Sequence, residues 1–152
     1  MGMRIGERLA AFEGSWTGEN RLRMMPDDEF DVSASTAAVA LAARGNVVTL
    51  SYTWADFDDN DQAGLIVLSD GVEPATVEVV WSDSWGQHPQ WMAMSGTASD
   101  DKVSFSGTYG DGLWGWHIHL HLGDAETLVM TMDNQGPDIP QYEVVRATWR
   151  RA

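Results

Sequence analysis

VSFSGTYGDGLWGWHIHLHL, residues 103–122, is the stretch that decides the fold. Larger apolar side chains alternate with small or polar ones on both sides of the turn residues Gly110-Asp111-Gly112. Because successive residues of a strand point to opposite faces, this period of two predicts two strands joined as a β-hairpin. A glycine-rich loop that binds phosphate would lead into a helix, whereas here a second strand follows.

Segments of the same kind fill the chain from residue 14 onward, and turn residues separate them. Segment 30–43 is rich in alanine, but we assign it as a strand because Arg44-Gly45-Asn46 leads directly into another strand-like segment. We expect about ten strands, at residues 14–25, 30–43, 47–54, 64–69, 76–81, 91–97, 103–109, 113–122, 127–133 and 142–151.

One segment before these strands has the spacing of a helix. Ile5, Leu9 and Phe12 form one apolar stripe within residues 4–12, and Gly14 stands where glycine often ends a helix. A succession of hairpins with no helix between them favours an up-and-down antiparallel β-barrel over a Greek-key sandwich. We therefore predict an all-β domain over residues 1–152, with this short helix packed over one end.

Composition limits the classes of partner. The 152 residues are 43% hydrophobic, which is enough for a core, and no apolar run is long enough to cross a bilayer. The formal net charge of −14 repels phosphate backbones and anionic lipid, so we expect neither nucleic acid nor membrane as a partner. Cysteine is absent, and the first residues lack the apolar run of a signal peptide, which together favour a cytoplasmic location.

The sequence LAAFEGSWTG, residues 9–18, places the predicted helix just before Gly-x-Trp-x-Gly at the start of the first strand. This order resembles the calycin superfamily of lipocalins and fatty-acid-binding proteins, and within it most of all the nitrobindin-like proteins and related bacterial families. The resemblance implies that Trp16 packs at the floor of the barrel against an arginine of the last strand. Arg146 and Arg150 are the candidates, and Arg150 is assigned this structural role.

Departures from the family limit what the resemblance carries over. Residues 19–21 are not the glycines that nitrobindins have there, and Met25-Pro26 only partly matches their Tyr-Pro. Segment 142–151 lacks the haem-ligating histidine, so haem binding does not transfer by position. Fatty-acid-binding proteins hold the lipid carboxylate with an Arg and a Tyr, and here Tyr142 and Arg146 share a strand face at a different spacing.

The eight tryptophans and eight methionines either fill the barrel or line a ligand cavity. In segment 47–54 the bulkier set, which includes Tyr52 and Trp54, is predicted to face inward, whereas in segment 91–97 the pattern does not decide between Trp91 and its neighbours. We expect a protein that encloses a small, largely apolar molecule. The candidate ligand contacts are Trp54, Trp81, Trp91, Tyr109, Trp116, Met130, Met132, Tyr142 and Arg146.

His117, His119 and His121 alternate with apolar residues and therefore share one face of a strand. The apolar set should face the interior, which leaves the histidines on the outer wall. On that wall His117 and His119 could share a metal ion such as zinc. The alternative orientation would place the histidines inside as metal ligands, haem ligands or acid–base groups. A metal- or haem-binding protein is the second functional hypothesis. A homodimer formed through a tryptophan-rich face is the third.

No catalytic motif is recognisable in the sequence, so we assign no catalytic residue and favour a binding protein over an enzyme. The acidic stretch 56–61 is similar to a calcium loop, but Asp61 replaces its glycine and Val67 its final glutamate. We predict a solvated hairpin turn there. His88 is predicted to lie in a loop, residues 84–90.

Overall fold

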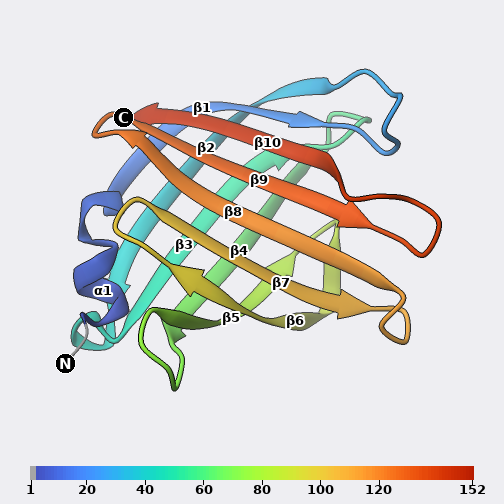
Figure 1. Cartoon of the computed structure of the whole chain (residues 1–152). Coiled ribbons are helices and arrows are strands. Elements are labelled where there is room, and N and C mark those ends of the chain that lie inside the picture. Colours follow the sequence, from blue (N-terminus) through green and yellow to red (C-terminus); the bar gives the residue numbers. More distant parts are fainter. Residues whose placement is uncertain (1–2) are drawn as a thin grey trace.

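The computed structural model describes residues 3–152, and these form a closed antiparallel β-barrel of ten strands (Figure 1). Strands that follow one another in the sequence are hydrogen-bonded neighbours, and the ring closes where β1 pairs with β10. The predicted fold class and topology are confirmed. Within the described residues the strands are β1 (Gly14–Leu22), β2 (Asp31–Ala42), β3 (Val47–Ala55), β4 (Asp61–Asp70), β5 (Thr76–Asp83), β6 (Gln87–Ala98), β7 (Lys102–Tyr109), β8 (Trp114–Asp124), β9 (Thr127–Gln135) and β10 (Tyr142–Arg151).

The predicted bounds differ most where a turn is tighter than its sequence indicates. Strand β6 begins at Gln87, which pairs with Asp83 across a short turn, so the loop expected over residues 84–90 is wrong. His88 accordingly lies in a strand rather than in a loop. The alanine-rich segment is strand β2, as predicted, and a short 3-10 turn, η2 (Ala43–Gly45), joins it to β3.

The predicted N-terminal helix is present but divided into two short pieces, α1 (Ile5–Arg8) and the 3-10 helix η1 (Ala10–Phe12). The apolar stripe is buried as expected, since Ile5, Leu9 and Phe12 are each 1% exposed. These pieces cover one end of the barrel, here named the closed end (Figure 1). The Asp70 carboxylate, at the end of β4, accepts the backbone N–H of Ile5 at 3.1 Å and holds the start of α1.

Trp16 packs against an arginine at the closed end, but not against the one predicted. The guanidinium carbon of Arg151 lies 4.3 Å from the centroid of the Trp16 ring. The inward series of β10 runs through Ala147 and Trp149, and Arg151 follows it, whereas Arg146 and Arg150 have the opposite parity. The assignment of Arg146 or Arg150 to this contact is therefore wrong.

The same guanidinium joins three segments of the chain. It donates hydrogen bonds to the carbonyl oxygens of Ala11 at 2.6 Å, Glu13 at 2.9 Å and Ala125 at 2.8 Å. The Trp16 indole N–H donates to the Phe12 carbonyl oxygen at 3.0 Å. The 3-10 helix, the β8–β9 turn and the closing strands are thus held together at the closed end.

Gly18 allows the closing strands to approach one another. It pairs with Trp149 across β1 and β10, and a side chain at this position would collide with the Thr148 carbonyl oxygen. The second glycine of the Gly-x-Trp-x-Gly sequence is therefore needed for barrel closure.

The interior is packed with the residues that alternate inward. The prediction that Tyr52 and Trp54 face inward is confirmed, since they are 4% and 7% exposed. In β6 the inward residues are Met92 and Met94, and Trp91 is 69% exposed. The prediction that Trp91 lines the cavity is wrong because its parity in β6 points it outward.

The contact between β6 and β7 is the shortest in the ring. The two strands pair only through residues 95–98 and 103–106, although β6 begins at Gln87 and β7 ends at Tyr109.

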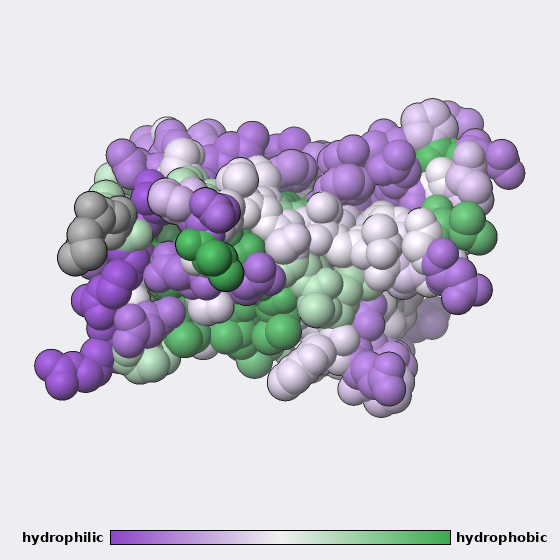
Figure 2. Space-filling model, turned by 60° about the horizontal axis from the view of Figure 1, so that its bottom comes forward, coloured by the Kyte–Doolittle hydropathy of each residue, from purple (hydrophilic) through white to green (hydrophobic). Residues whose placement is uncertain are grey.

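The face at the bottom of Figure 1, which carries β5, β6 and β7, is largely hydrophilic with an apolar area near its middle (Figure 2). No helix among residues 3–152 is long and apolar enough to span a membrane.

Replacing Arg151 with alanine removes three hydrogen bonds and the cation–π contact, so we expect the free energy of unfolding to fall by about 2–4 kcal/mol. Urea unfolding measures this change. Arg150→Ala is the matched control, because this side chain is exposed on the outer face of β10. We expect the control to change stability by less than about 0.5 kcal/mol. Equal losses in the two variants would contradict the role given to Arg151.

Candidate functional site

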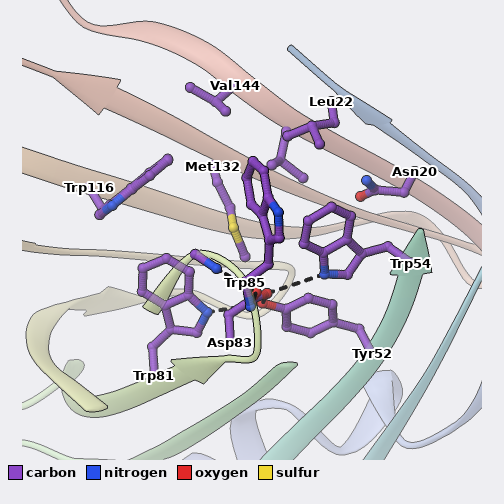
Figure 3. Close-up of a pocket in the computed structure, with 12 residues that line it drawn as sticks. Asn20, Leu22, Tyr52, Trp54, Trp81, Asp83, Trp85, Trp116, Met132 and Val144 are labelled. Atoms are coloured by element: carbon purple, nitrogen blue, oxygen red, sulfur yellow. Dashed lines mark hydrogen bonds between the residues drawn. The ribbon is translucent and has the colours of Figure 1, made fainter. Parts of the chain in front are cut away.

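A small cavity lies inside the barrel at the end opposite α1, here named the cavity end (Figure 3). Its volume is about 40 Å³, which is room for only a few water molecules and far below the roughly 300–1,000 Å³ of typical ligand sites. The barrel therefore fills most of its own interior. The lining residues are Asn20, Leu22, Tyr52, Trp54, Trp81, Asp83, Trp85, Gly86, Trp116, Met132, Val144 and Val145.

Asp83 is the polar centre of the cavity end. It is 4% exposed and continues the inward series of β5 beyond Trp81. One carboxylate oxygen accepts the Tyr52 hydroxyl at 2.5 Å and the Trp54 indole N–H at 3.3 Å. The other oxygen accepts the backbone N–H groups of Trp85 and Gly86, both at 2.9 Å. Four donors thus fix this carboxylate between strands β3 and β5 and the turn that follows.

Tyr52 connects the carboxylate to a further tryptophan. Its hydroxyl oxygen accepts the Trp81 indole N–H at 3.0 Å while its proton is donated to Asp83. Burial, followed by the charge of Asp83, raises the pKa of the Tyr52 hydroxyl well above its ordinary value. Gly64 faces Tyr52 in the β3–β4 pair, and a side chain there would collide with the phenol ring. The glycine thus leaves room for the phenol to reach Asp83.

Trp85 covers the cavity from the β5–β6 turn. Its indole lies edge-on to Trp54, with ring centroids 5.3 Å apart, and to Phe57 at 6.1 Å. Figure 3 shows the ring standing between Trp54 and Met132. The side chain is 37% exposed, whereas Trp54 and Trp81 are buried. Of these three indoles in the lining, Trp85 is therefore the most accessible to solvent.

Asn20 presents a free amide to the cavity. The residue is 3% exposed and lies on the inward side of β1. Within residues 3–152 its side chain makes no hydrogen bond. No side-chain nitrogen or oxygen of the described chain is fully enclosed without a partner, so the Asn20 amide remains accessible from the cavity that it lines. The amide is therefore open to a bound molecule.

The structure brings together four of the predicted ligand contacts, since Trp54, Trp81, Trp116 and Met132 all line the cavity. Trp81 and Trp116 lie edge-to-face with ring centroids 5.7 Å apart. Met130 is fully buried in the core but is not part of the lining.

Three further candidates are held elsewhere. Tyr109 bonds with the Asn134 amide at 3.0 Å, and Tyr142 donates to the Met24 carbonyl oxygen at 2.5 Å. Arg146 lies on the outer face and pairs with Glu143 at 2.8 Å. These contacts occupy the polar groups by which Tyr142 and Arg146 would bind a ligand.

The histidines lie on the outer wall, since Ile118 and Leu120 between them are buried, and the alternative inward orientation is wrong. His117 bonds with Gln135 at 3.0 Å, and His119 with the Ser104 hydroxyl at 2.9 Å. Burial lowers the pKa of His119, and the charge of nearby Asp133 partly opposes that shift. Across residues 3–152, no group of three or more His, Cys, Asp or Glu side chains is placed to hold a metal ion, His117, His119 and His121 included.

The acidic turn is organised by its first residue. The Asp56 carboxylate accepts the backbone N–H groups of Asp58 at 2.9 Å and Asn60 at 3.0 Å, and the Gln62 amide at 2.9 Å. These bonds, that from Asn60 above all, lower the pKa of Asp56. The carboxylate thus serves the hairpin itself.

Sequence reasoning missed Asp83, Asn20 and Trp85. For the first two a signal was present, because the inward parity of Trp81 leads to Asp83 and that of Trp16 leads to Asn20. The predicted strand over residues 76–81 ended one step too early to include Asp83. Trp85 lies in a turn, where no alternation indicates the direction of a side chain.

Replacing Tyr52 with phenylalanine leaves the Trp81 N–H without its acceptor and takes one donor from Asp83. We expect a loss of about 2–3 kcal/mol in the free energy of unfolding, measured with urea. Tyr109→Phe is the control, because this hydroxyl is exposed, and we expect a change below about 1 kcal/mol. A Tyr52→Phe variant as stable as the unmodified chain would show that the buried network contributes nothing.

The raised pKa of Tyr52 also predicts a dependence of stability on pH. The folded chain retains the Tyr52 proton at pH values where the unfolded chain, with an ordinary pKa of about 10, has lost it. This contribution is complete below pH about 10 and is lost as pH rises further, by up to about 1.4 kcal/mol per pH unit. Urea unfolding at pH about 9 and about 11 should show a smaller loss in Tyr52→Phe than in the unmodified chain. Parallel losses in the two proteins would exclude Tyr52 as the cause.

Two solved structures have the same fold as this chain but low sequence identity to it. The crystal structure of Rv2717c from M. tuberculosis matches with a TM-score of 0.74 and 15% identity, over 100% of this chain and 99% of that one. The S-type phycobiliprotein lyase CPES from Guillardia theta matches with a TM-score of 0.67 and 12% identity, over 99% of this chain and 93% of that one. At such identities the likeness concerns the fold, which is the calycin-like barrel expected from residues 9–18.

The narrower likeness to nitrobindin stays a prediction. No curated protein matches the chain. One sequence family, described as proteins of unknown function and numbered DUF1579, matches residues 5–151, and the chain therefore belongs to that family.

Proposed function

We propose that this chain is a binding protein that takes a small, largely apolar molecule at the cavity end of the barrel. The observation that carries the proposal is a cavity walled by four tryptophans, one of which enters from a turn. Large aromatic surfaces with a few polar groups are typical of small-molecule sites. A likeness in fold to a protein named as a phycobiliprotein lyase supports a role in ligand binding.

The size of the cavity implies that Trp85 moves when a ligand enters. About 40 Å³ is too small for an aromatic ring, and Trp85 occupies the most accessible part of the lining. Its two edge-on contacts are each worth about 0.5–1.5 kcal/mol, so displacing the indole costs about 1–3 kcal/mol. That cost lowers the apparent affinity by roughly 5- to 150-fold.

Other expectations from the sequence remain predictions. These are the cytoplasmic location, the homodimer, and the exclusion of nucleic acid and membrane that follows from the net charge of −14. No observation at the outer histidine face favours zinc or haem as a second candidate, so we propose the binding function alone.

Replacing Trp85 with alanine should strengthen the binding of N-phenyl-1-naphthylamine, a neutral probe that fluoresces in apolar surroundings. Because the indole no longer has to be displaced, we expect a dissociation constant about tenfold lower, with saturation at one equivalent. Trp91→Ala is the matched control, since it removes a tryptophan that is 69% exposed on the outer face, and it should bind as the unmodified chain does. Absence of saturable binding to both the unmodified chain and Trp85→Ala would overturn the proposed function.

A further inference from the structure

The carboxylate of Asp83 is buried without a cation beside it. Among residues 3–152, every ion pair within 4.0 Å involves other groups. Its two oxygens accept four hydrogen bonds and donate none, which is the pattern of an ionised carboxylate. Hydrogen bonds from neutral donors solvate this charge but do not neutralise it. The cavity end therefore holds a negative charge that attracts a cation.

The walls of the cavity also favour a positively charged ligand. The lining contains four indoles and a phenol, whose ring faces attract cations, and no lysine, arginine or histidine of the described chain is part of it. The net charge of −14 adds a field of the same sign over the whole molecule. An anionic ligand would be repelled at short range by Asp83 and at longer range by this field.

Asn20 supplies the third observation. Asn20 is 3% exposed as a residue and lines the cavity, and its side-chain amide makes no hydrogen bond within the described chain. The carbonyl oxygen of this amide can accept an N–H from an ammonium group, which reduces the cost of removing that group from water. An occupant with hydrogen-bonding capacity can bond with this amide, whereas a purely apolar occupant would cover it without supplying a partner.

We infer that the cavity takes a cation, namely an amine with an apolar or aromatic body whose ammonium group lies between Asn20, Asp83 and the indole faces. This inference rests on the proposed function and narrows it to one class of ligand. It also separates this chain from barrels that hold a lipid carboxylate, because the only charged residue in the described lining is an acid.

Three probes with one skeleton test the inference. Phenethylammonium, 2-phenylethanol and phenylacetate share a phenyl ring and a short side chain but carry positive, zero and negative charge near neutral pH. Isothermal titration calorimetry with the unmodified chain and with Trp85→Ala gives the affinity for each. We expect phenethylammonium to bind about tenfold more tightly than 2-phenylethanol, and phenylacetate to bind more weakly than both.

Two variants assign the preference to Asp83. In Asp83→Asn we expect the preference for phenethylammonium over 2-phenylethanol, measured as the ratio of their affinities, to fall about tenfold. Asp133→Asn is the control, because it removes the same charge from the outer face, and it should leave all three affinities unchanged. The probe series on the unmodified chain decides the inference even if Asp83→Asn does not fold.

The outcomes separate this inference from the function on which it rests. If 2-phenylethanol or phenylacetate binds as tightly as phenethylammonium, the inference is overturned and the binding function stands. The same holds if N-phenyl-1-naphthylamine saturates while none of the three probes binds. If no probe, the naphthylamine included, binds to the unmodified chain or to Trp85→Ala, both proposals fail.

Discussion

Barrel closure through Arg151 is the interaction on which the rest of the structure depends. Its guanidinium lies on the Trp16 ring and bonds with carbonyl oxygens of the 3-10 helix and of the β8–β9 turn. A closed sheet has no free edges, but it needs its first and last strands to be held in register. With the ring fixed and one end covered by α1 and η1, the opposite end is left to present a cavity.

At the cavity end the side chains are arranged around a buried polar group, the carboxylate of Asp83. A buried carboxylate is costly unless it is well hydrogen-bonded, and Asp83 meets that condition with donors from β3 and from its own turn. The same donors fix the rings of Tyr52 and Trp54 and the backbone of the turn that carries Trp85. The hydrogen bonds that stabilise the buried carboxylate therefore also position the aromatic walls. The charge preference of the cavity and its shape thus depend on the same network.

Strand order and topology could be predicted because period-two alternation is local and the turn residues are plain in the sequence. The inward face was predictable where one set of side chains was clearly bulkier, as with Tyr52 and Trp54. It was not predictable in β6, because Trp91 competes with two methionines of similar hydrophobicity for the interior. Arg151 was missed although its parity matches that of Trp149, and the contact between Trp85 and Trp54 depends on tertiary packing that no short segment specifies.

The pairing of β1 with β10 has a consequence for biosynthesis. Trp16 emerges from the ribosome well over a hundred residues before Arg151, and the nascent chain has no partner for the free edge of β1 until then. Contacts of such long sequence separation form slowly, and an unpaired strand edge is prone to association with other chains. The high negative charge makes nascent chains repel one another. It thus opposes their association during the time before β1 can pair with β10.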